Sequence, residues 1–206
     1  MTSASAGPPR STPHARICVF CGSSYGVHPD YALSAERLGS CLARRGIGLV
    51  YGGANVGMMK RLADATLAGG GHVTGVIPTL LVHRELAHGA VHDLRVVASM
   101  HERKATMANL ADAFVVLAGG LGTFEELFEI VTWAQLGLHR KPIGLVDTRS
   151  YYARLGAFLD HAVAEGFIRP ENRSLLVVDP DVERLIETLM AGAGLRRPSA
   201  VDEAVV

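Results

Sequence analysis

Residues 115–126 read VVLAGGLGTFEE: an apolar segment, a glycine-rich turn and the polar start of a helix-like segment. Glycine fills three of the four positions 119–122, at Gly119, Gly120 and Gly122. Glycine lets the backbone approach a ligand closely, and the free N–H groups of a following helix attract anions. This stretch therefore predicts a strand, a turn and a helix, with an anion such as phosphate bound at the turn.

The same alternation of segments continues along the chain. Strand-like apolar runs fall at residues 17–20, 48–51, 72–77, 94–97, 113–117, 143–146 and 175–178. Helical spacing falls at residues 29–45, 56–68, 100–110, 123–136, 151–165 and 179–190. Strands that alternate with helices indicate an α/β fold with a doubly wound parallel sheet. The connection at 78–93 breaks this order, and we expect a non-helical loop there that forms a lid or a substrate wall.

The two ends of the chain differ in composition from its centre. Residues 1–16 are rich in Ser, Ala and Pro and predict a disordered leader, whereas residues 192–206 predict a flexible tail. A single domain is expected at 17–191. Apolar runs stay below the roughly 18 residues of a membrane span, so we expect no membrane association and a cytoplasmic protein. The odd number of cysteines, three, agrees with a reducing compartment.

The charges of the chain are balanced, with 20 basic and 20 acidic residues. Such a balance provides no overall attraction to nucleic acid or to an anionic membrane. We therefore expect a small molecule as the partner, bound by local groups.

Two groups of residues could suggest a metal. Cys18 and Cys21 form a C-x-x-C, but residues three apart in a strand point to opposite faces, which favours core packing. His83, His88 and His92 lie close together in the chain, yet their spacing matches no strong metal motif. We expect no metal site.

A second glycine-rich turn occurs in LVYGGANVGMMK, residues 49–60, with Gly52, Gly53 and Gly57. It has the same order of strand, Gly-Gly, short loop, Gly and helix as the first turn. The dinucleotide fingerprint G-x-G-x-x-G is not met in the first turn, because Glu125 stands at the third glycine position. A Gly-Lys-Ser/Thr phosphate loop is also absent from the sequence.

The carboxylates after the first turn allow two interpretations. Thr123 and Glu126 have the T-x-x-E spacing of a capping box, which gives Glu126 a structural role. A carboxylate beside an anion site is equally well explained by a reaction in which positive charge develops on the substrate. The spacing leaves both open, and Glu125 with Glu129 is interpreted as a solvated helix face.

The segment SMHERKATM, residues 99–107, starts with another capping box, formed by Ser99 and Glu102. Arg103 and Lys104 follow it in the first turns of a helix, where cations oppose the helix dipole. Their position after a strand suits an anionic ligand, and the alternative is a salt bridge to an acidic neighbour.

Several segments together resemble the LONELY GUY (LOG) family of cytokinin riboside 5'-monophosphate phosphoribohydrolases. The resemblance covers residues 17–167 and is carried by VFCGSS (19–24), YGGANVGMM (51–59), MHERK (100–104), AGGLGTFEE (118–126) and TWAQLG (132–137). It implies a Rossmann-like homodimer that hydrolyses the N-glycosidic bond of N6-modified AMP and releases the free base and ribose 5-phosphate. Plain AMP is a further candidate substrate, and the family needs no metal or nicotinamide cofactor.

The resemblance also implies site residues. The essential arginine and glutamate of the family fall on Arg103 and Glu126. Substrate contacts fall on Glu85, Lys104, Gly119, Gly120, Leu121, Gly122, Thr123, Phe124, Glu125 and Thr132. The chain departs from the family pattern at Ala118, where the pattern has proline, and at Lys60, where it has glycine.

The chemistry of the predicted site fits this reaction. Cleavage of a ribosyl C–N bond builds positive charge on the sugar, which a carboxylate such as Glu126 stabilises while it orients or deprotonates water. One alternative is a non-enzymatic carrier or sensor of a phosphorylated, nucleotide-like ligand. Another is a lysine decarboxylase, which needs a Schiff-base lysine, and the chain has only Lys60, Lys104 and Lys141.

Overall fold

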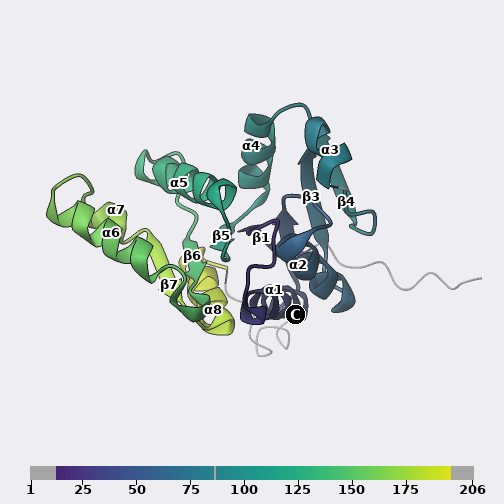
Figure 1. Ribbon diagram of the computed structural model, residues 1–206, viewed down its shortest axis with the longest axis horizontal. Helices are drawn as coiled ribbons and strands as arrows, with labels where there is room; N and C mark the ends of the chain where they lie inside the picture. Colours follow the sequence, from purple (N-terminus) through teal and green to yellow (C-terminus); the bar gives the residue numbers. More distant parts are fainter. Residues whose placement is uncertain (1–12, 86, 196–206) are drawn as a thin grey trace, which may run out of the picture.

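The computed structural model describes residues 13–85 and 87–195 and contains a seven-stranded parallel sheet with helices on both faces (Figure 1). The strand order is β4-β3-β2-β1-β5-β6-β7. The strands are β1 (Ala15–Phe20), β2 (Ile47–Tyr51), β3 (Val73–Pro78), β4 (Asp93–Val97), β5 (Ala113–Val116), β6 (Ile143–Val146) and β7 (Leu176–Asp179). The predicted α/β, Rossmann-like doubly wound sheet is confirmed.

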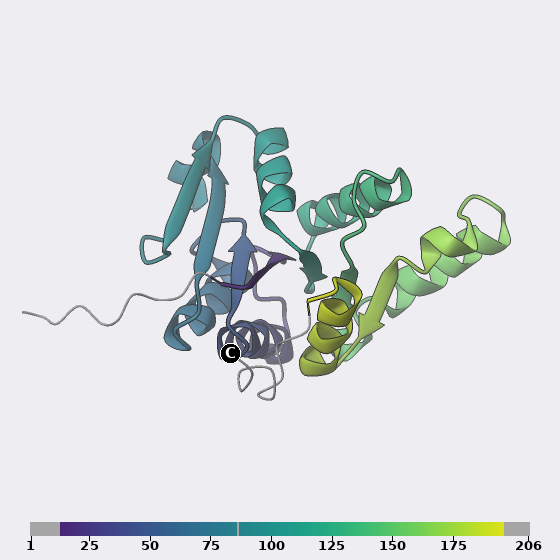
Figure 2. The same cartoon turned by 180° about the vertical axis from the view of Figure 1, so that it is seen from behind.

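At least one helix lies in every connection between consecutive strands. The helices are α1 (Pro29–Arg44), α2 (Gly57–Ala68), α3 (Thr79–Glu85), α4 (Met100–Leu110), α5 (Leu121–Gln135), α6 (Ala153–Ala164), α7 (Pro170–Arg173) and α8 (Val182–Gly192), with a 3₁₀ turn η1 (Thr148–Ser150). Local sequence fixes several starts: Pro29 opens α1, Ser99 caps α4 and Asp181 caps α8. In both views α6 and α7 extend away from the rest of the molecule (Figures 1 and 2).

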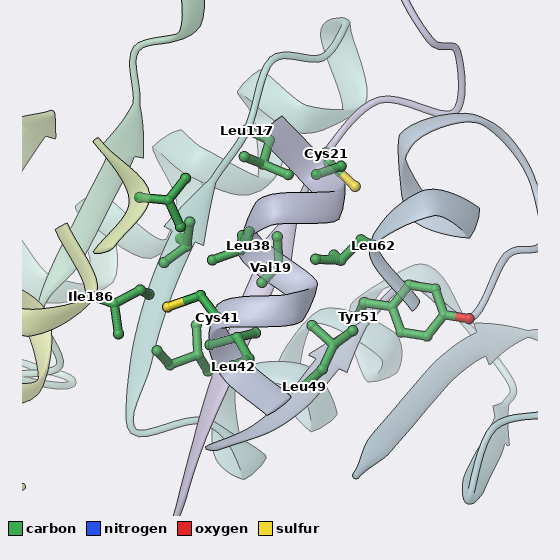
Figure 3. Close-up of a cluster of buried hydrophobic side chains, with 14 of the residues drawn as sticks. Val19, Cys21, Leu38, Cys41, Leu42, Leu49, Tyr51, Leu62, Leu117 and Ile186 are labelled. Carbon is green, nitrogen blue, oxygen red and sulfur yellow. The ribbon is translucent and has the colours of Figure 1, made fainter. Parts of the chain in front are cut away.

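Successive side chains along the strands point alternately into two separate hydrophobic cores, one on each face of the sheet. Ile17 and Val19 of β1 face one core, which α1, α2 and α8 cover, and Cys18 and Phe20 face the other, which α4 and α5 cover. Figure 3 shows the first core, where side chains of α1 such as Leu38 gather against those of the sheet. Because the five inner strands are buried on both faces, they read as continuous apolar runs in the sequence, whereas the edge strands β4 and β7 are partly exposed.

The cysteines belong to these cores, as predicted. Cys18 and Cys21 lie on opposite faces of the sheet, and both are buried with free thiols. Burial raises the pKa of both thiols well above the ordinary value. They pack as small apolar side chains.

The strand order places a topological switch between β1 and β5. From these two neighbouring strands the chain runs in opposite directions, through α1 to β2 and through α5 to β6. Loops that diverge in this way leave a crevice beyond the carboxyl ends of the strands. The loops after β1 and β5 also touch, because the N–H of Gly22 donates to the carbonyl of Ala118 at 3.1 Å.

The connection at 78–93 differs from the expected non-helical loop, because it contains α3. Pro78 ends β3, and the run TLLVHRE that follows it has the composition of a short helix. A bridge between Ala54 and Ala87 then ties the end of this connection to the loop after β2.

The ordered elements reach beyond the expected domain limits. Ala15 and Arg16 belong to β1, so this strand begins inside the predicted leader, and α8 ends at Gly192. Leu195 packs against the first core. The remainder of the predicted leader and tail, residues 1–12 and 196–206, lies outside the described residues. Among the described helices, none has both the length and the apolar character needed to cross a membrane.

Two helix glycines give a matched test of the packing between α1 and α2. A Cβ at Gly39 of α1 would lie 2.4 Å from the Leu62 carbonyl of α2, whereas a Cβ at Gly156 of α6 would meet its nearest atom, on Arg173, at 3.7 Å. We expect Gly39→Ala to lower the free energy of unfolding by about 1–3 kcal/mol through overpacking. Gly156→Ala should raise it by about 0.5–1 kcal/mol. Urea unfolding curves measure both, and equal effects would contradict the close packing at Gly39.

Candidate active site

A cavity of about 220 Å³ lies at the topological switch. Its walls come from the carboxyl ends of β1 and β2, the first turns of α5, and α2 and α4; they include Val19, Phe20, Cys21, Gly22, Ser23, Gly52, Met59, Arg103, Met107, Gly120, Leu121, Gly122, Thr123 and Glu126. A larger open groove of about 650 Å³ runs between α1 and the start of α8, and two ion pairs lie along it, Arg149 with Asp30 and Arg44 with Glu183. The glycine turn and the Arg103–Glu126 pair meet only at the smaller cavity among the described pockets.

One end of the cavity has the geometry of an anion site. Helix α5 begins at Leu121, with Gly120 as its N-cap. As in any helix, the first N–H groups have no partner within the helix, and here they lie at the cavity wall. Gly119 permits the close packing of this turn, because a Cβ there would lie 2.1 Å from the Thr123 hydroxyl. The predicted anion turn therefore has the required backbone.

The predicted capping box at Thr123 and Glu126 is wrong. Since α5 starts two residues earlier, at Leu121, Thr123 is its third residue and is buried. The reason is the glycine turn itself: Gly120 is extended enough to act as the N-cap without a side-chain hydrogen bond. Glu126 is thereby left without a capping role, and its side chain lies at the cavity with 11% exposure.

Arg103 is held by two strand ends. Its Nε donates to the Val76 carbonyl of β3 and its Nη2 to the Gly52 carbonyl after β2, each at 3.1 Å. Its Nη1 lies 3.8 Å from Oε1 of Glu126. Gly52 makes this possible, because a Cβ at that position would lie 2.0 Å from Nη2. Two backbone carbonyls therefore fix the guanidinium so that one edge faces Glu126.

The surroundings of Glu126 raise the pKa of its carboxyl group. Burial raises the pKa of this carboxyl to about 7, while the positive charge of Arg103 acts in the opposite direction. Glu125 adds a smaller upward push by like-charge repulsion. A carboxyl group with a pKa near neutrality, inside a cavity and beside a fixed cation, has the properties of a general acid or base.

Lys104 and the exposed-face carboxylates form a separate network. The Lys104 Nζ lies 2.5 Å from Glu125 and 3.0 Å from Glu129. Glu125 keeps the expected solvent exposure, at 55%, whereas Glu129 is partly covered, at 22%, and a cation from α4 pairs with both. For Lys104 the salt-bridge alternative describes the structure, and its side chain does not line the cavity.

Two further predicted substrate contacts, Phe124 and Thr132, do not line the cavity. Phe124 packs its ring against Tyr151 and Tyr152, and Thr132 is exposed, with its hydroxyl bonded to the carbonyl of Phe128. Glu85 is the last residue of α3, and its side chain lies outside the described part of the structure.

The second glycine turn has a supporting role. Only Gly52 of its three glycines lines the cavity, whereas Gly53 packs against β3 and Gly57 against the Ser23 backbone. Whereas the first turn presents N–H groups to the cavity, the second turn contacts other parts of the protein, namely Arg103 and the loop after β1.

Lys60, where the chain departs from the family pattern, does not line the cavity, and neither do His88 and His92. Lys60 pairs with Asp64 at 2.8 Å, and Asp64 also contacts His88 at 3.0 Å. His92 stacks on His72, with ring centroids 5.0 Å apart. Within 13–85 and 87–195, no cluster of three or more histidine, cysteine or acidic side chains is arranged to hold a metal ion.

Sequence reasoning missed part of the cavity wall. Cys21, Gly22 and Ser23 follow β1 and line the cavity, and Met59 and Met107 close it from α2 and α4. The Gly-Ser-Ser after an apolar strand was the available signal for the first group. Met59 and Met107 gave no such signal, because methionines in a helical segment have the pattern of ordinary core residues.

The fold and the site define a Rossmann-like α/β protein with a glycine-rich anion turn and a buried arginine–glutamate pair. A family model described as "Possible lysine decarboxylase" matches residues 59–189. Two Arabidopsis thaliana proteins named cytokinin riboside 5'-monophosphate phosphoribohydrolase are 51% and 49% identical over 174 residues; the alignments cover 84% of this chain and 80% and 82% of the relatives. The chain belongs to this family, the LOG family, as the resemblance implied.

Solved structures support the fold. A molybdenum cofactor carrier protein from Chlamydomonas reinhardtii is 21% identical, with a TM-score of 0.64 over 86% of this chain and 98% of that chain. A molybdenum cofactor binding protein from Rippkaea orientalis is 22% identical, with a TM-score of 0.65 over 88% of this chain and 98% of that chain. At this identity the likeness concerns the fold alone.

The raised pKa of Glu126 predicts a pH-dependent contribution to stability. The unfolded chain releases this proton near pH 4.5 and the folded protein near pH 7, so the folded state binds more protons between these values. The stability of the wild type relative to Glu126→Gln should therefore fall as pH rises through this window, by about 2–3 kcal/mol in total. Urea unfolding at pH 5, 6, 7 and 8 measures the difference. A difference that stays constant over this range would mean that the Glu126 carboxyl is not desolvated.

Proposed function

We propose that this protein hydrolyses the N-glycosidic bond of N6-modified AMP, that is, of a cytokinin riboside 5'-monophosphate. The products are the free base and ribose 5-phosphate. The observation that carries the proposal is the buried Arg103–Glu126 pair, which shares one cavity with the anion-binding turn of α5. The names of relatives about 50% identical to this chain support the same reaction.

The phosphate end of the substrate binds at the start of α5. Its oxygens accept hydrogen bonds from the first N–H groups of the helix, at Leu121, Gly122 and Thr123. Binding energy from the phosphate then fixes the ribose over the cavity, where it lowers the barrier at the anomeric carbon.

Glu126 acts at the sugar. As a carboxylate it stabilises the positive charge that develops when the C–N bond breaks, and it orients and deprotonates the attacking water. Burial makes this electrostatic stabilisation stronger than it would be in water. Arg103 favours the ionised form of Glu126 and, held by two backbone carbonyls, keeps that carboxylate in place.

The alternative of a carrier or sensor deserves a direct test, because carriers with this fold exist. A carrier has no need for a buried carboxylate with a pKa near 7 beside the bound phosphate, and this favours the enzyme. Decarboxylation through a Schiff base is disfavoured by the contacts of the three lysines. Lys60 pairs with Asp64, Lys104 with two glutamates, and Lys141 donates to the Ala108 carbonyl.

The assembly and location are part of the proposal. We propose a homodimer, supported by the large exposed apolar side chains Leu121 and Phe128 on α5 and Leu136 at its C-cap. A cytoplasmic location is supported by the buried free thiols of Cys18 and Cys41, which suit a reducing compartment. Plain AMP is proposed as a weaker substrate.

Removal of the catalytic pair should abolish turnover. With N6-isopentenyl-AMP, Glu126→Gln and Arg103→Ala should each lower kcat by at least about a hundredfold, because each removes transition-state stabilisation. Chromatography of the released base measures the rate. Glu129→Gln is the matched control on the same helix, and it should keep most of the activity. Near-normal turnover by Glu126→Gln would refute the assignment, and binding of the nucleotide by the wild type without any release of base would favour the carrier.

The pH dependence of the reaction should report on Glu126. Since the carboxylate is the active form, kcat/KM should rise with pH on an acidic limb with an apparent pKa near 7, the value that burial gives this group. Initial rates at low substrate concentration between pH 5 and 9 measure this profile. A limb near the ordinary glutamate value of 4.5 would contradict the assigned environment.

A further inference from the structure

Three consecutive carbonyls before the α5 turn each accept a hydrogen bond from a different residue. The Tyr152 hydroxyl donates to the Leu117 carbonyl at 2.7 Å, and the Gly22 N–H donates to the Ala118 carbonyl at 3.1 Å. The Tyr151 hydroxyl donates to the Gly119 carbonyl at 2.5 Å. The backbone that leads from β5 to the turn is therefore held at every step from 117 to 119.

These bonds also orient the N–H groups of the turn. A peptide group is planar, so the carbonyl of one residue and the N–H of the next point in opposite directions. Holding the Gly119 oxygen with a hydroxyl therefore fixes the direction of the Gly120 N–H. This N–H belongs to the residue that caps α5 and lines the cavity.

The two tyrosines reach the turn because of an unusual backbone. They follow η1, where Arg149 and Ser150 both have φ of 56°, a conformation that L residues adopt at a cost. Asp147 closes this bend by accepting the Tyr152 N–H at 2.7 Å. After these two non-glycine residues with positive φ, the side chains of Tyr151 and Tyr152 both reach the loop at residues 117–119.

Ring contacts connect the tyrosines to α5 itself. Tyr151 and Tyr152 pack edge to face with centroids 5.0 Å apart, and Phe124, in the first turn of α5, lies 6.5 Å from both. Tyr31 of α1 packs edge to face on the other side of Tyr151, at 5.7 Å. The rings limit the movement of the hydroxyls relative to the helix that forms the anion site.

We propose that Tyr151 and Tyr152 are positioning residues that orient the turn at 119–122 for the 5'-phosphate of the substrate. The identity of the anion as a 5'-phosphate rests on the proposed function. The chain has alanine at 118, so no proline ring restrains the backbone there, and the two phenols supply that restraint. Both hydroxyls donate to the loop, and neither tyrosine lines the cavity that holds Arg103 and Glu126.

The test removes one hydroxyl and measures phosphate recognition apart from catalysis. Tyr151→Phe in the full chain keeps the ring contacts and loses the bond to Gly119. Since one hydrogen bond is lost, ribose 5-phosphate should bind about three- to tenfold more weakly by calorimetry. KM for N6-isopentenyl-AMP should rise by a similar factor, while kcat stays within about twofold.

The controls separate positioning from general damage. Tyr31→Phe removes a phenol hydroxyl from the same ring cluster and should leave ribose 5-phosphate binding unchanged. The melting temperature of Tyr151→Phe should stay close to that of the wild type, because this side chain is 37% exposed. Tyr152→Phe should also weaken binding of ribose 5-phosphate, with some loss of stability, because it leaves the Leu117 carbonyl without its partner.

The outcomes distinguish this inference from the proposed function. Unchanged ribose 5-phosphate binding by Tyr151→Phe would overturn the positioning role, even if the wild type is an active hydrolase. Weaker binding by Tyr151→Phe, in a wild type that releases no base, would support the positioning role and refute the hydrolase. A wild type that binds neither ribose 5-phosphate nor inorganic phosphate would overturn both.

Discussion

The guanidinium of Arg103 connects the parts of this molecule that form the site. It bonds the carbonyls at the ends of β2 and β3 and faces the Glu126 carboxylate of α5. Burial raises the pKa of this carboxyl group and the positive charge of Arg103 lowers it, with a smaller downward contribution from Lys104; the result is a pKa of about 7, at which the group can exchange protons. The sheet supplies the rigid carbonyls, so the fold determines the chemistry through one side chain.

The sequence predicted the sheet well because the five inner strands, β1, β2, β3, β5 and β6, are buried on both faces. Such strands appear as short apolar runs between glycines, and they are hard to confuse with the longer amphipathic helices around them. Arg103 and Glu126 were singled out because cations and carboxylates near strand ends need an explanation, and the structure brings the two side chains together at one cavity. The start of α5 was wrong since a glycine cap leaves no side-chain signal, and α3 was missed because a seven-residue helix has too little periodicity.

Contacts between distant residues were not predicted. Glu125 and Glu129 have the spacing of a solvated face, and only the fold brings Lys104 from another helix against them. Tyr151 lies 32 residues from Gly119, and nothing near either residue in the sequence indicates their hydrogen bond. Local patterns therefore identify candidate residues for the site, while the residues that hold them in place depend on the tertiary structure.

The contact between Gly52 and Arg103 has a consequence for how this site can vary. The guanidinium of Arg103 occupies the space that a side chain at position 52 would need. A residue larger than glycine at position 52 would therefore displace the guanidinium from its present place. A methyl group at 52 would therefore disable the guanidinium without altering any charged residue. The placement of the guanidinium therefore depends on the glycine at 52 as much as on the arginine itself.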